Sequence, residues 1–400
     1  MGHALSKGGR ALRCRPVYAP SWMIMVSRAW KLFRSAPILV QPILSAIRRL
    51  SVFCGGGTTV TTAVPVSGHV PCWPPAGWDI MEEPLHTVRI HQIHAFSPDI
   101  RVLDLRARHD GCLPSFSAGA HIDLHLPNGL VRQYSLANDP QETHRYLLAV
   151  AREKNSRGGS AFIHDSMREG DVVQIGAPRN LFPLAVGTGQ SVLIAGGIGI
   201  TPLCSMVQHL AAQGRPWTLH YAMRHRAQAV CLDMAHAAAA RTAGGMVQTY
   251  CREVDGARMD IAGIIHAAPS DAHFYCCGPA SMIAAFETAC ATLPRTQVHS
   301  EHFAPVAAPD VTGGFTVVLA RSRRTLAIPA GKTILDVLKA AGVAVASSCH
   351  EGVCGMCETT VLEGMPDARD SILTDAEKAE GRTIMVCCSG SRTARLVLDL

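Results

Sequence analysis

The chain is most clearly patterned between residues 81 and 187, where apolar and polar positions alternate in short runs. A period of two residues is typical of a half-buried β-strand. The run 119–126 alternates most regularly, and Pro127-Asn128-Gly129 after it is a hairpin-turn signal. Further runs lie at 88–93, 100–105, 130–136, 145–152 and 171–175, with one helical stretch near 160–168. This pattern predicts a small antiparallel β-barrel domain.

From residue 188 to residue 303 the pattern changes to strands that alternate with helices. Ser191–Ala195 is a short run, apolar after its first residue, of the kind found in buried parallel strands. The sequence predicts further strands at 217–223, 246–251 and 273–276, and helices at 229–241, at 260–267 and from Ser281 onward. Alternation of this kind predicts a doubly wound α/β domain.

A third domain is expected at the C-terminal end. Residues 304–313 are rich in Ala, Pro and Gly and are interpreted as a linker. After it, 315–320 and 324–328 form a predicted hairpin and 333–341 a predicted helix. We therefore expect a β-grasp-like α+β domain over 314–400.

The first eighty residues differ in kind from the rest of the chain. They contain four of the five Trp residues and eight Pro, and no apolar period persists through them. The hypothesis that we favour is an unstructured or spurious extension. A targeting segment and an accessory function are the alternatives, because the region is basic and poor in acids.

Charge and cysteine content narrow the class of protein. Residues 1–80 hold nine Lys and Arg against one acid, so the other 320 hold 28 against 30 and are close to neutral. That balance leaves no basic footprint for nucleic acid. No run of eighteen apolar residues suggests a membrane span. Most of the 15 Cys stand singly in apolar segments, which favours buried thiols in a reducing cytoplasm.

Two motifs in the barrel region suit the binding of a flat heterocycle that carries a phosphate group. In Arg132-Gln-Tyr-Ser135, Arg132 and Tyr134 are expected on one strand face and Ser135 on the other. An arginine can grip a phosphate with two hydrogen bonds, and a tyrosine ring can lie against a heterocycle. In Arg157-Gly-Gly-Ser160, the glycines let backbone N–H groups approach an anion where a helix begins. Each motif alone is also compatible with an exposed strand or a plain turn, whereas together they favour a flavin phosphate site.

The α/β region carries a glycine-rich turn directly after its first strand. The turn reads Gly196-Gly-Ile-Gly-Ile-Thr-Pro202, in which Thr201 suits a helix N-cap and Pro202 the first helical position. It departs from the GxGxxG fingerprint but still forms a strand–turn–helix unit that can receive a pyrophosphate. Cys277-Gly-Pro279 follows a later strand. Cys277 is interpreted either as a buried thiol or as a small side chain that lines a nicotinamide pocket.

The strongest chemical signal is a cluster of cysteines. Cys349, Cys354 and Cys357 are separated by four and two residues, and Cys387 and Cys388 compete for a fourth position. This is the spacing of plant-type [2Fe–2S] proteins. A zinc site would normally show pairs separated by two residues, so zinc is the weaker alternative.

From Met81 to Leu400 the chain resembles the phthalate dioxygenase reductase family, which includes vanillate O-demethylase oxidoreductases. The resemblance is carried by the motifs above together with Ala177-Pro-Arg-Asn180, Tyr275-Cys-Cys-Gly-Pro279 and the ending Leu396–Leu400. It implies an FMN barrel over 81–187, an NAD domain over 188–303 and a ferredoxin domain over 314–400. One departure is that the family often has an Arg two places after the Ser that follows the fourth ligand, where Gly390 and Ser391 stand here.

The resemblance also implies roles for individual residues. FMN would be held by Arg132, Tyr134, Ser135, Arg157, Gly158, Gly159 and Ser160, and bordered by Val150, Arg152 and Thr201. The nicotinamide nucleotide would be received by Gly196, Gly197, Gly199, Thr201, Pro202, Cys277, Gly278 and Pro279. The cluster would be bound by Cys349, Cys354, Cys357 and Cys387, where Cys387 rather than Cys388 aligns with the family's fourth ligand.

The function that the resemblance implies is electron transfer in the catabolism of aromatic compounds. NADH would reduce FMN, FMN would reduce the cluster, and a separate Rieske-type terminal oxygenase would receive the electrons, with no protein acid or base in the chemistry. The protein would be a monomer with no nucleic-acid or membrane partner. The alternatives are a stand-alone NAD(P)H reductase with a general acceptor and, more remotely, a non-catalytic iron–sulfur sensor.

The choice between NADH and NADPH depends on the end of the strand 217–223. Arg224 and Arg226 follow that strand, and no carboxylate comes before Asp233. A carboxylate at this point usually binds the ribose 2′-hydroxyl of NAD, and an arginine the 2′-phosphate of NADP. The resemblance favours NADH, with better tolerance of NADPH than a relative that has an acid here.

Overall fold

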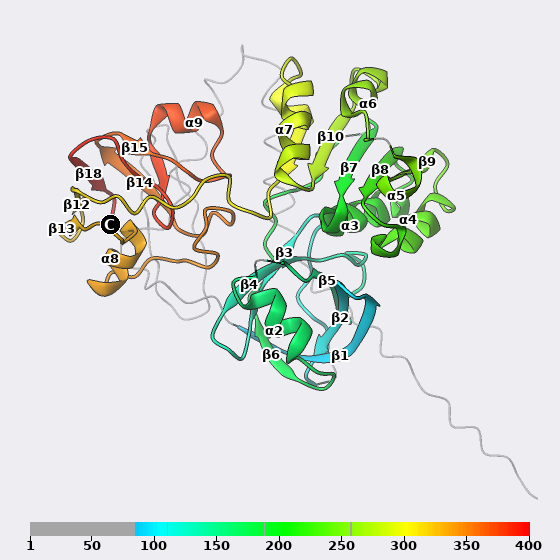
Figure 1. Ribbon diagram of the computed structural model, residues 1–400, viewed down its shortest axis with the longest axis horizontal. Helices are drawn as coiled ribbons and strands as arrows, with labels where there is room; N and C mark the ends of the chain where they lie inside the picture. Colours follow the sequence, from blue (N-terminus) through cyan, green and yellow to red (C-terminus); the bar gives the residue numbers. More distant parts are fainter. Residues whose placement is uncertain (1–84, 110, 155, 188, 257) are drawn as a thin grey trace, which may run out of the picture. The chain divides into compact units, whose positions relative to one another are not determined.

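The computed structural model describes residues 85–109, 111–154, 156–187, 189–256 and 258–400 (Figure 1). The predicted N-terminal extension, 1–80, lies outside these residues. All described residues belong to one compact unit, 77–400. They form three successive folded regions in the predicted order.

The first region is a six-stranded antiparallel sheet in the order β4-β3-β6-β1-β2-β5. Its core consists of the inward-facing residues of alternating strands, among them Ile90, Leu103 and Ile122. The β3–β4 hairpin turns at residues 127–129, where Gly129 takes a φ of +81° and its N–H donates to the Leu126 carbonyl at 2.9 Å. The elements are β1 (His86–Ser97), β2 (Ile100–Ala107), β3 (His121–His125), β4 (Val131–Ser135), β5 (Tyr146–Ala151), α2 (Gly159–Asp165) and β6 (Val172–Ile175).

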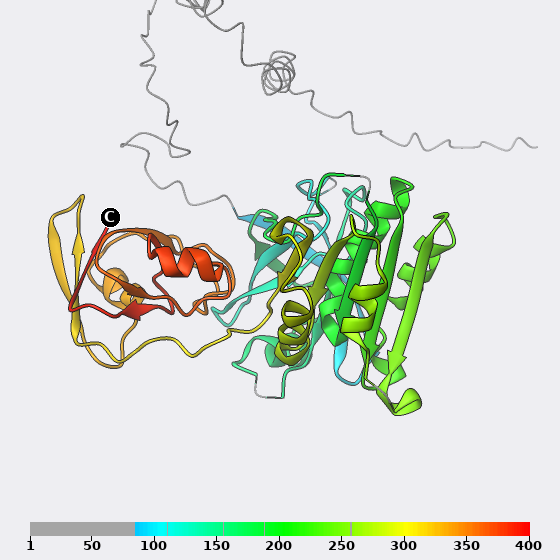
Figure 2. The same cartoon turned by 90° about the horizontal axis from the view of Figure 1, so that it is seen from above.

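The second region is a parallel five-stranded sheet in the order β11-β10-β7-β8-β9. Along β7, Leu193 and Ala195 pack into one apolar core with α3 and α4, while Val192 and Ile194 pack into another with α6 and α7. The sheet is therefore buried on both faces, as a doubly wound fold requires (Figure 2). Its elements are β7 (Ser191–Gly196), η1 (Gly197–Gly199), α3 (Ile200–Ala212), β8 (Trp217–Met223), η2 (Arg226–Gln228), α4 (Leu232–Ala239), β9 (Gly245–Cys251), α5 (Arg252–Asp255), α6 (Ile261–Ala267), β10 (His273–Cys277), α7 (Ala280–Ala289), η3 (Arg295–Gln297) and β11 (Val298–Glu301).

The third region has a five-stranded sheet, β13-β12-β18-β14-β16, and a two-stranded sheet, β15-β17. The C-terminal strand β18 lies in the middle, parallel to β12 and antiparallel to β14, which is a β-grasp arrangement. Helix α8 begins with a capping box between Thr333 and Asp336. The elements are β12 (Phe315–Leu319), β13 (Arg324–Ile328), α8 (Ile334–Ala340), β14 (Glu358–Glu363), β15 (Pro366–Asp367), α9 (Asp375–Glu380), β16 (Thr383–Met385), β17 (Gly390–Ser391) and β18 (Arg395–Leu398).

The start of α3 differs from the prediction. Gly199 is the N-cap residue, with no side-chain hydrogen bond to cap the helix. Thr201 is therefore the second residue inside the helix and not its N-cap. The Thr201 hydroxyl instead donates to the Ile198 carbonyl at 3.0 Å. The turn Gly197–Gly199 is a short 3-10 helix that leads directly into α3, which moves the helix start two residues toward the N-terminus.

Candidate functional site

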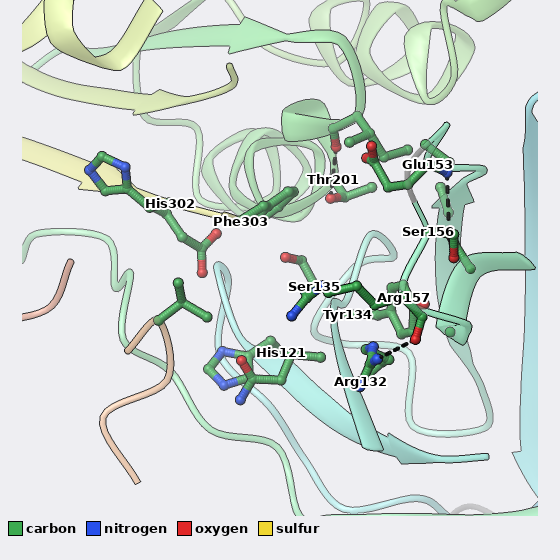
Figure 3. A pocket seen from close by; sticks show the side chains of 18 residues that line it. His121, Arg132, Tyr134, Ser135, Glu153, Ser156, Arg157, Thr201, His302 and Phe303 are labelled. Carbon is green, nitrogen blue, oxygen red and sulfur yellow. Dashed lines mark hydrogen bonds between the residues drawn. The ribbon is translucent and has the colours of Figure 1, made fainter. Parts of the chain in front are cut away.

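A cavity of about 210 Å³ opens beside strand β4, where several predicted flavin residues meet (Figure 3). Its walls come from β3, β4, β5, the loop 153–160, the start of α3 and the segment 301–303. The lining residues are His121, Arg132, Gln133, Tyr134, Ser135, Ala149, Ala151, Glu153, Ser156, Arg157, Gly159, Ser160, Ile198, Thr201, Glu301, His302, Phe303 and Val353.

Arg132 connects strand β4 to the glycine turn 25 residues later. Its guanidinium donates to the Val131 carbonyl at 2.8 Å and to the Arg157 carbonyl at 2.9 Å. A Cβ on Gly159 would stand only 2.7 Å from Cγ of Arg132. Glycine at 159 is therefore needed for the arginine side chain to pass over the turn.

The rest of β4 also faces the cavity. Tyr134 and Ser135 both line it. Burial raises the pKa of Tyr134 to about 12, which keeps its hydroxyl protonated.

The loop before α2 is held by serine hydroxyls. The Glu153 N–H donates to the Ser160 hydroxyl at 3.2 Å, and that hydroxyl donates to Ser156 at 3.0 Å. Gly158 caps the helix with a φ of +89°, which favours glycine. The predicted turn 157–160 is thus an ordered wall of the cavity.

Two predicted flavin neighbours lie elsewhere. The Val150 side chain is buried in the barrel core, and its neighbours Ala149 and Ala151 line the cavity instead. Arg152 forms an ion pair with Asp165, at 2.5 Å and 2.9 Å, outside the cavity. Neither side chain therefore lines this cavity, and the role beside FMN that the resemblance implies for Val150 and Arg152 stays a prediction.

The predicted nucleotide residues come together at the carboxyl ends of the adjacent strands β7 and β10. A Cβ on Gly199 would stand 2.3 Å from the Cys277 carbonyl, and one on Gly278 would stand 3.1 Å from Gly196 Cα. Such close contact between the two loops is possible only without side chains. Thr201 lines the cavity, whereas the Cys277 thiol is fully buried and burial raises its pKa.

The structure supplies a carboxylate near the end of β8 that sequence reasoning missed. Glu253, just after β9, donates its N–H to the Arg224 carbonyl at 3.1 Å. Its carboxylate lies 3.4 Å from the His225 ring. Arg224 and Arg226 are exposed there. Only the parallel pairing of β8 with β9 brings this acid to the place where a ribose 2′-hydroxyl is expected.

Sequence reasoning also missed two titratable groups of the cavity. Glu301 ends β11 beside Cys277 of β10, and its Oε2 is inaccessible with no hydrogen-bond partner. Burial raises its pKa to about 8. Burial and the nearby Arg179 lower the pKa of His121 to about 4. No local pattern signalled Glu301, because it reaches the cavity from β11, beside β10 at the edge of the sheet.

Four of the predicted ligand cysteines interact through their thiols. Cys349 shares hydrogen bonds with Cys354 and Cys387, and Cys387 with Cys357. These contacts hold the pKa of Cys349 far below its usual value and raise that of Cys354. The Glu351 N–H donates to the Cys349 sulfur at 3.3 Å, as expected beside a thiolate.

Cys388 also touches Cys387, but Cys387 and not Cys388 interacts with Cys349 and Cys357. It donates to the Met385 carbonyl at 3.7 Å and would lie 2.5 Å from a Cβ on Gly352. Among the described residues, no group of three or more His, Cys, Asp or Glu is arranged to hold a single metal ion. A [2Fe–2S] cluster has two irons and four thiolates, and the thiol set with its inward N–H fits that group.

Comparisons with known proteins agree with this geometry. Residues 317–391 match the family described as 2Fe-2S iron-sulfur cluster binding domain. Residues 193–288 match the oxidoreductase NAD-binding domain. Together with the fold, these matches define an oxidoreductase with a nicotinamide-nucleotide domain and a [2Fe–2S] domain.

Similarity over nearly the whole length of its relatives places the chain more closely. It is 53% identical to phenoxybenzoate dioxygenase subunit beta of Ectopseudomonas oleovorans, over 78% of this chain and 97% of that protein. It is 40% identical to a vanillate O-demethylase oxidoreductase of Pseudomonas sp. strain HR199, over 78% and 99%. The solved structure of phthalate dioxygenase reductase is similar with a TM-score of 0.61 and 37% identity, over 79% and 98%. The chain belongs to the phthalate dioxygenase reductase family, and its cofactors are NADH, FMN and a [2Fe–2S] cluster.

A search of the described residues found no helix long and apolar enough to cross a membrane.

Proposed function

We propose that the protein is the reductase component of a two-component aromatic-ring oxygenase or O-demethylase. In this proposal electrons pass from NADH through FMN to the [2Fe–2S] cluster and on to a Rieske-type terminal oxygenase. The observation that carries it is the full-length similarity to subunits of dioxygenase and O-demethylase systems. When bound, the flavin converts the two-electron hydride transfer into single-electron steps.

The chain's own residues hold and separate the cofactors. We infer that Arg132 and the turn 157–160 bind the flavin phosphate, because both line the cavity and the guanidinium contacts the Arg157 carbonyl of that turn. Tyr134, Ser135 and Thr201 border the ring from the other walls. Glycines on the two facing loops leave backbone N–H groups open to the nucleotide pyrophosphate. The residues proposed for the nucleotide are Gly196, Gly197, Gly199, Pro202, Cys277, Gly278 and Pro279.

For the cluster, Cys349, Cys354, Cys357 and Cys387 are the proposed ligands. Their mutual thiol contacts support this set, and the Cys388 sulfur, which donates to the Met385 carbonyl, has no such contact with Cys349 or Cys357. We further propose that the protein is a cytoplasmic monomer, because its thiol-rich sequence suits a reducing compartment.

A second function is favoured by one relative. A tetrachlorobenzoquinone reductase of Sphingobium chlorophenolicum is 43% identical over 80% of this chain and 100% of that protein. A stand-alone reductase that delivers electrons to a small quinone is therefore the alternative.

The two functions can be separated by offering both kinds of acceptor. The protein, loaded with FMN and cluster, is mixed with NADH and then with either an oxidised Rieske-type oxygenase of the vanillate class or tetrachlorobenzoquinone. We expect saturable, fast reduction of the oxygenase, measured as loss of its visible absorbance. Saturable turnover with the quinone and only slow, unsaturable reduction of the oxygenase would favour the stand-alone reductase.

A further inference from the structure

The turn that carries Cys387 is short, and the backbone N–H groups of two residues outside it, Asp310 and Arg369, donate to it. It lies between β16 and β17, and the N–H groups of Cys388 and Ser389 both donate to the Met385 carbonyl, at 3.2 Å and 3.1 Å. These internal bonds fix only the start of the turn. Its end, from Cys388 to Gly390, is fixed by Asp310 and Arg369.

Asp310 reaches this turn from the segment 304–313 that precedes the third region. It is 7% exposed, and its N–H donates to the Cys388 carbonyl at 2.7 Å. Its Oδ1 accepts from the N–H and the hydroxyl of Thr312, at 2.9 Å and 2.7 Å. The carboxylate is thus fixed in one orientation next to the residue that follows the proposed fourth ligand.

Gly390 shows how closely the carboxylate approaches the turn. A Cβ at this position would stand 1.6 Å from Oδ2 of Asp310 and 2.5 Å from its Cγ. The backbone of Gly390 does not have a positive φ. The missing side chain therefore serves the approach of Asp310 and not a left-handed turn.

Arg369 contacts both the turn and Asp310. Its backbone N–H donates to the Ser389 hydroxyl at 3.2 Å, and its guanidinium lies 3.7 Å from Asp310 Oδ1. The same guanidinium donates to Asp367 at 2.8 Å, and Asp367 pairs with Gly390 in the β15–β17 ladder. The carboxylate of Asp310 is thereby paired with a cation, as a buried charge requires.

We propose that Asp310 is a positioning residue for the iron–sulfur cluster, which fixes the turn of Cys387 through the Cys388 carbonyl and the Gly390 backbone. This inference rests on the proposed function, in which Cys387 is the fourth ligand. It assigns to the segment 304–313 a role in the stability and electronic environment of the cluster, beyond joining two domains.

The test compares Asp310→Ala and Asp310→Asn with wild type in the full, cofactor-loaded protein. Iron release to an excess of bathophenanthroline is followed by absorbance, and the dithionite-reduced cluster is examined by electron paramagnetic resonance. We expect Asp310→Ala to release iron about tenfold faster, the factor that matches loss of one charge-assisted hydrogen bond. The bonds lost are those that the carboxylate accepts from Thr312, which orient the segment whose Asp310 N–H donates to the Cys388 carbonyl. We also expect altered g-values, with a smaller effect for Asp310→Asn. NADH should still reduce FMN at the wild-type rate, because the flavin site is untouched.

Asp399→Asn is the matched control. Asp399 is a carboxylate of the same domain that accepts two hydrogen bonds from Arg321, at 2.8 Å and 2.7 Å, without contacting the Cys387 turn. Its substitution should leave iron release and the g-values unchanged. If Asp310→Ala does not fold, Asp310→Asn and Gly390→Ala decide the question.

Gly390→Ala tests the same contact independently, from the side of the turn. Its Cβ should displace the carboxylate and reproduce the phenotype of Asp310→Ala. The same substitution should add less in the Asp310→Ala background than in the wild type, because the two closest atoms, Oδ2 and Cγ, are then absent and only Cβ, at 2.9 Å, remains. Wild-type iron release and g-values in the Asp310 variants, even with a lower melting temperature, would overturn the inference. A wild-type protein that binds no iron would instead overturn the proposed function together with it.

Discussion

Replacing Gly159 with alanine adds one atom, Cβ, beside Arg132 and so tests the role of that arginine in the proposed flavin site. The added Cβ would stand 2.7 Å from Cγ and 2.8 Å from Nε of Arg132, so the middle of that side chain has to move. The displaced guanidinium loses its 2.9 Å bond to the Arg157 carbonyl and its alignment toward the flavin phosphate. Alanine is a better helix former than glycine at the first position of α2, so the fold itself should not suffer.

The expected loss is that of a charge-assisted hydrogen bond, about 1.5–3 kcal/mol. This corresponds to a rise of about 10- to 150-fold in the Kd for FMN. The assay is titration of the deflavinated protein with FMN, followed by quenching of flavin fluorescence. Gly111→Ala is the control, because its Cβ would meet only the His109 carbonyl at an ordinary 3.6 Å. An unchanged Kd in Gly159→Ala would refute the assignment of Arg132 as the phosphate ligand.

Three further predictions follow from the cavity, the nucleotide site and the N-terminal boundary. Burial holds the pKa of Glu301 at about 8, above its ordinary 4.5, so the folded state keeps a proton that the unfolded chain releases. The wild type should therefore lose stability relative to Glu301→Gln as the pH rises from about 4.5 through 8. The measurement is the difference in melting temperature between the two proteins at each pH. A difference that does not change with pH would contradict the burial of this carboxyl. Arg226→Asp should lower kcat/KM for NADPH by about tenfold and leave kcat/KM for NADH nearly unchanged, because we expect this exposed arginine to contact only the 2′-phosphate. A wild-type preference for NADPH that reverses in the variant would contradict NADH as the electron donor. A chain that begins at Met81 should retain FMN and reduce cytochrome c like the full-length protein, and loss of FMN would show that the first eighty residues are structural.

The sequence predicted the cluster and the phosphate-binding motifs because each lies within a short segment. The spacing of Cys349, Cys354 and Cys357 is local, and so is the strand–turn–helix at 196–202. Their environment is not local. Arg132 and Gly159 meet only after the barrel closes, and alternation along β5 does not reveal that the Val150 side chain packs into the barrel core.

Residues supplied by neighbouring strands were the ones that the sequence could not predict. Glu253 reaches the end of β8 from β9, and Glu301 reaches the cavity from β11, which lies beside β10 at the edge of the sheet. Asp310 stood in a segment whose composition indicated only a linker, yet it is buried against the Cys388 carbonyl. Such contacts depend on strand order and on long-range packing, which no local pattern encodes.

The most direct test of the proposed electron path is anaerobic stopped-flow reduction by NADH of the wild type and of Cys354→Ser. Cys354 lies in the ferredoxin domain, so its substitution should remove the cluster absorbance and leave FMN and its reduction by NADH at the wild-type rate. We predict that only the wild type then passes electrons on to cytochrome c or to an oxidised Rieske-type oxygenase. Equal one-electron output from the two proteins, or a cluster spectrum that survives in Cys354→Ser, would contradict the account.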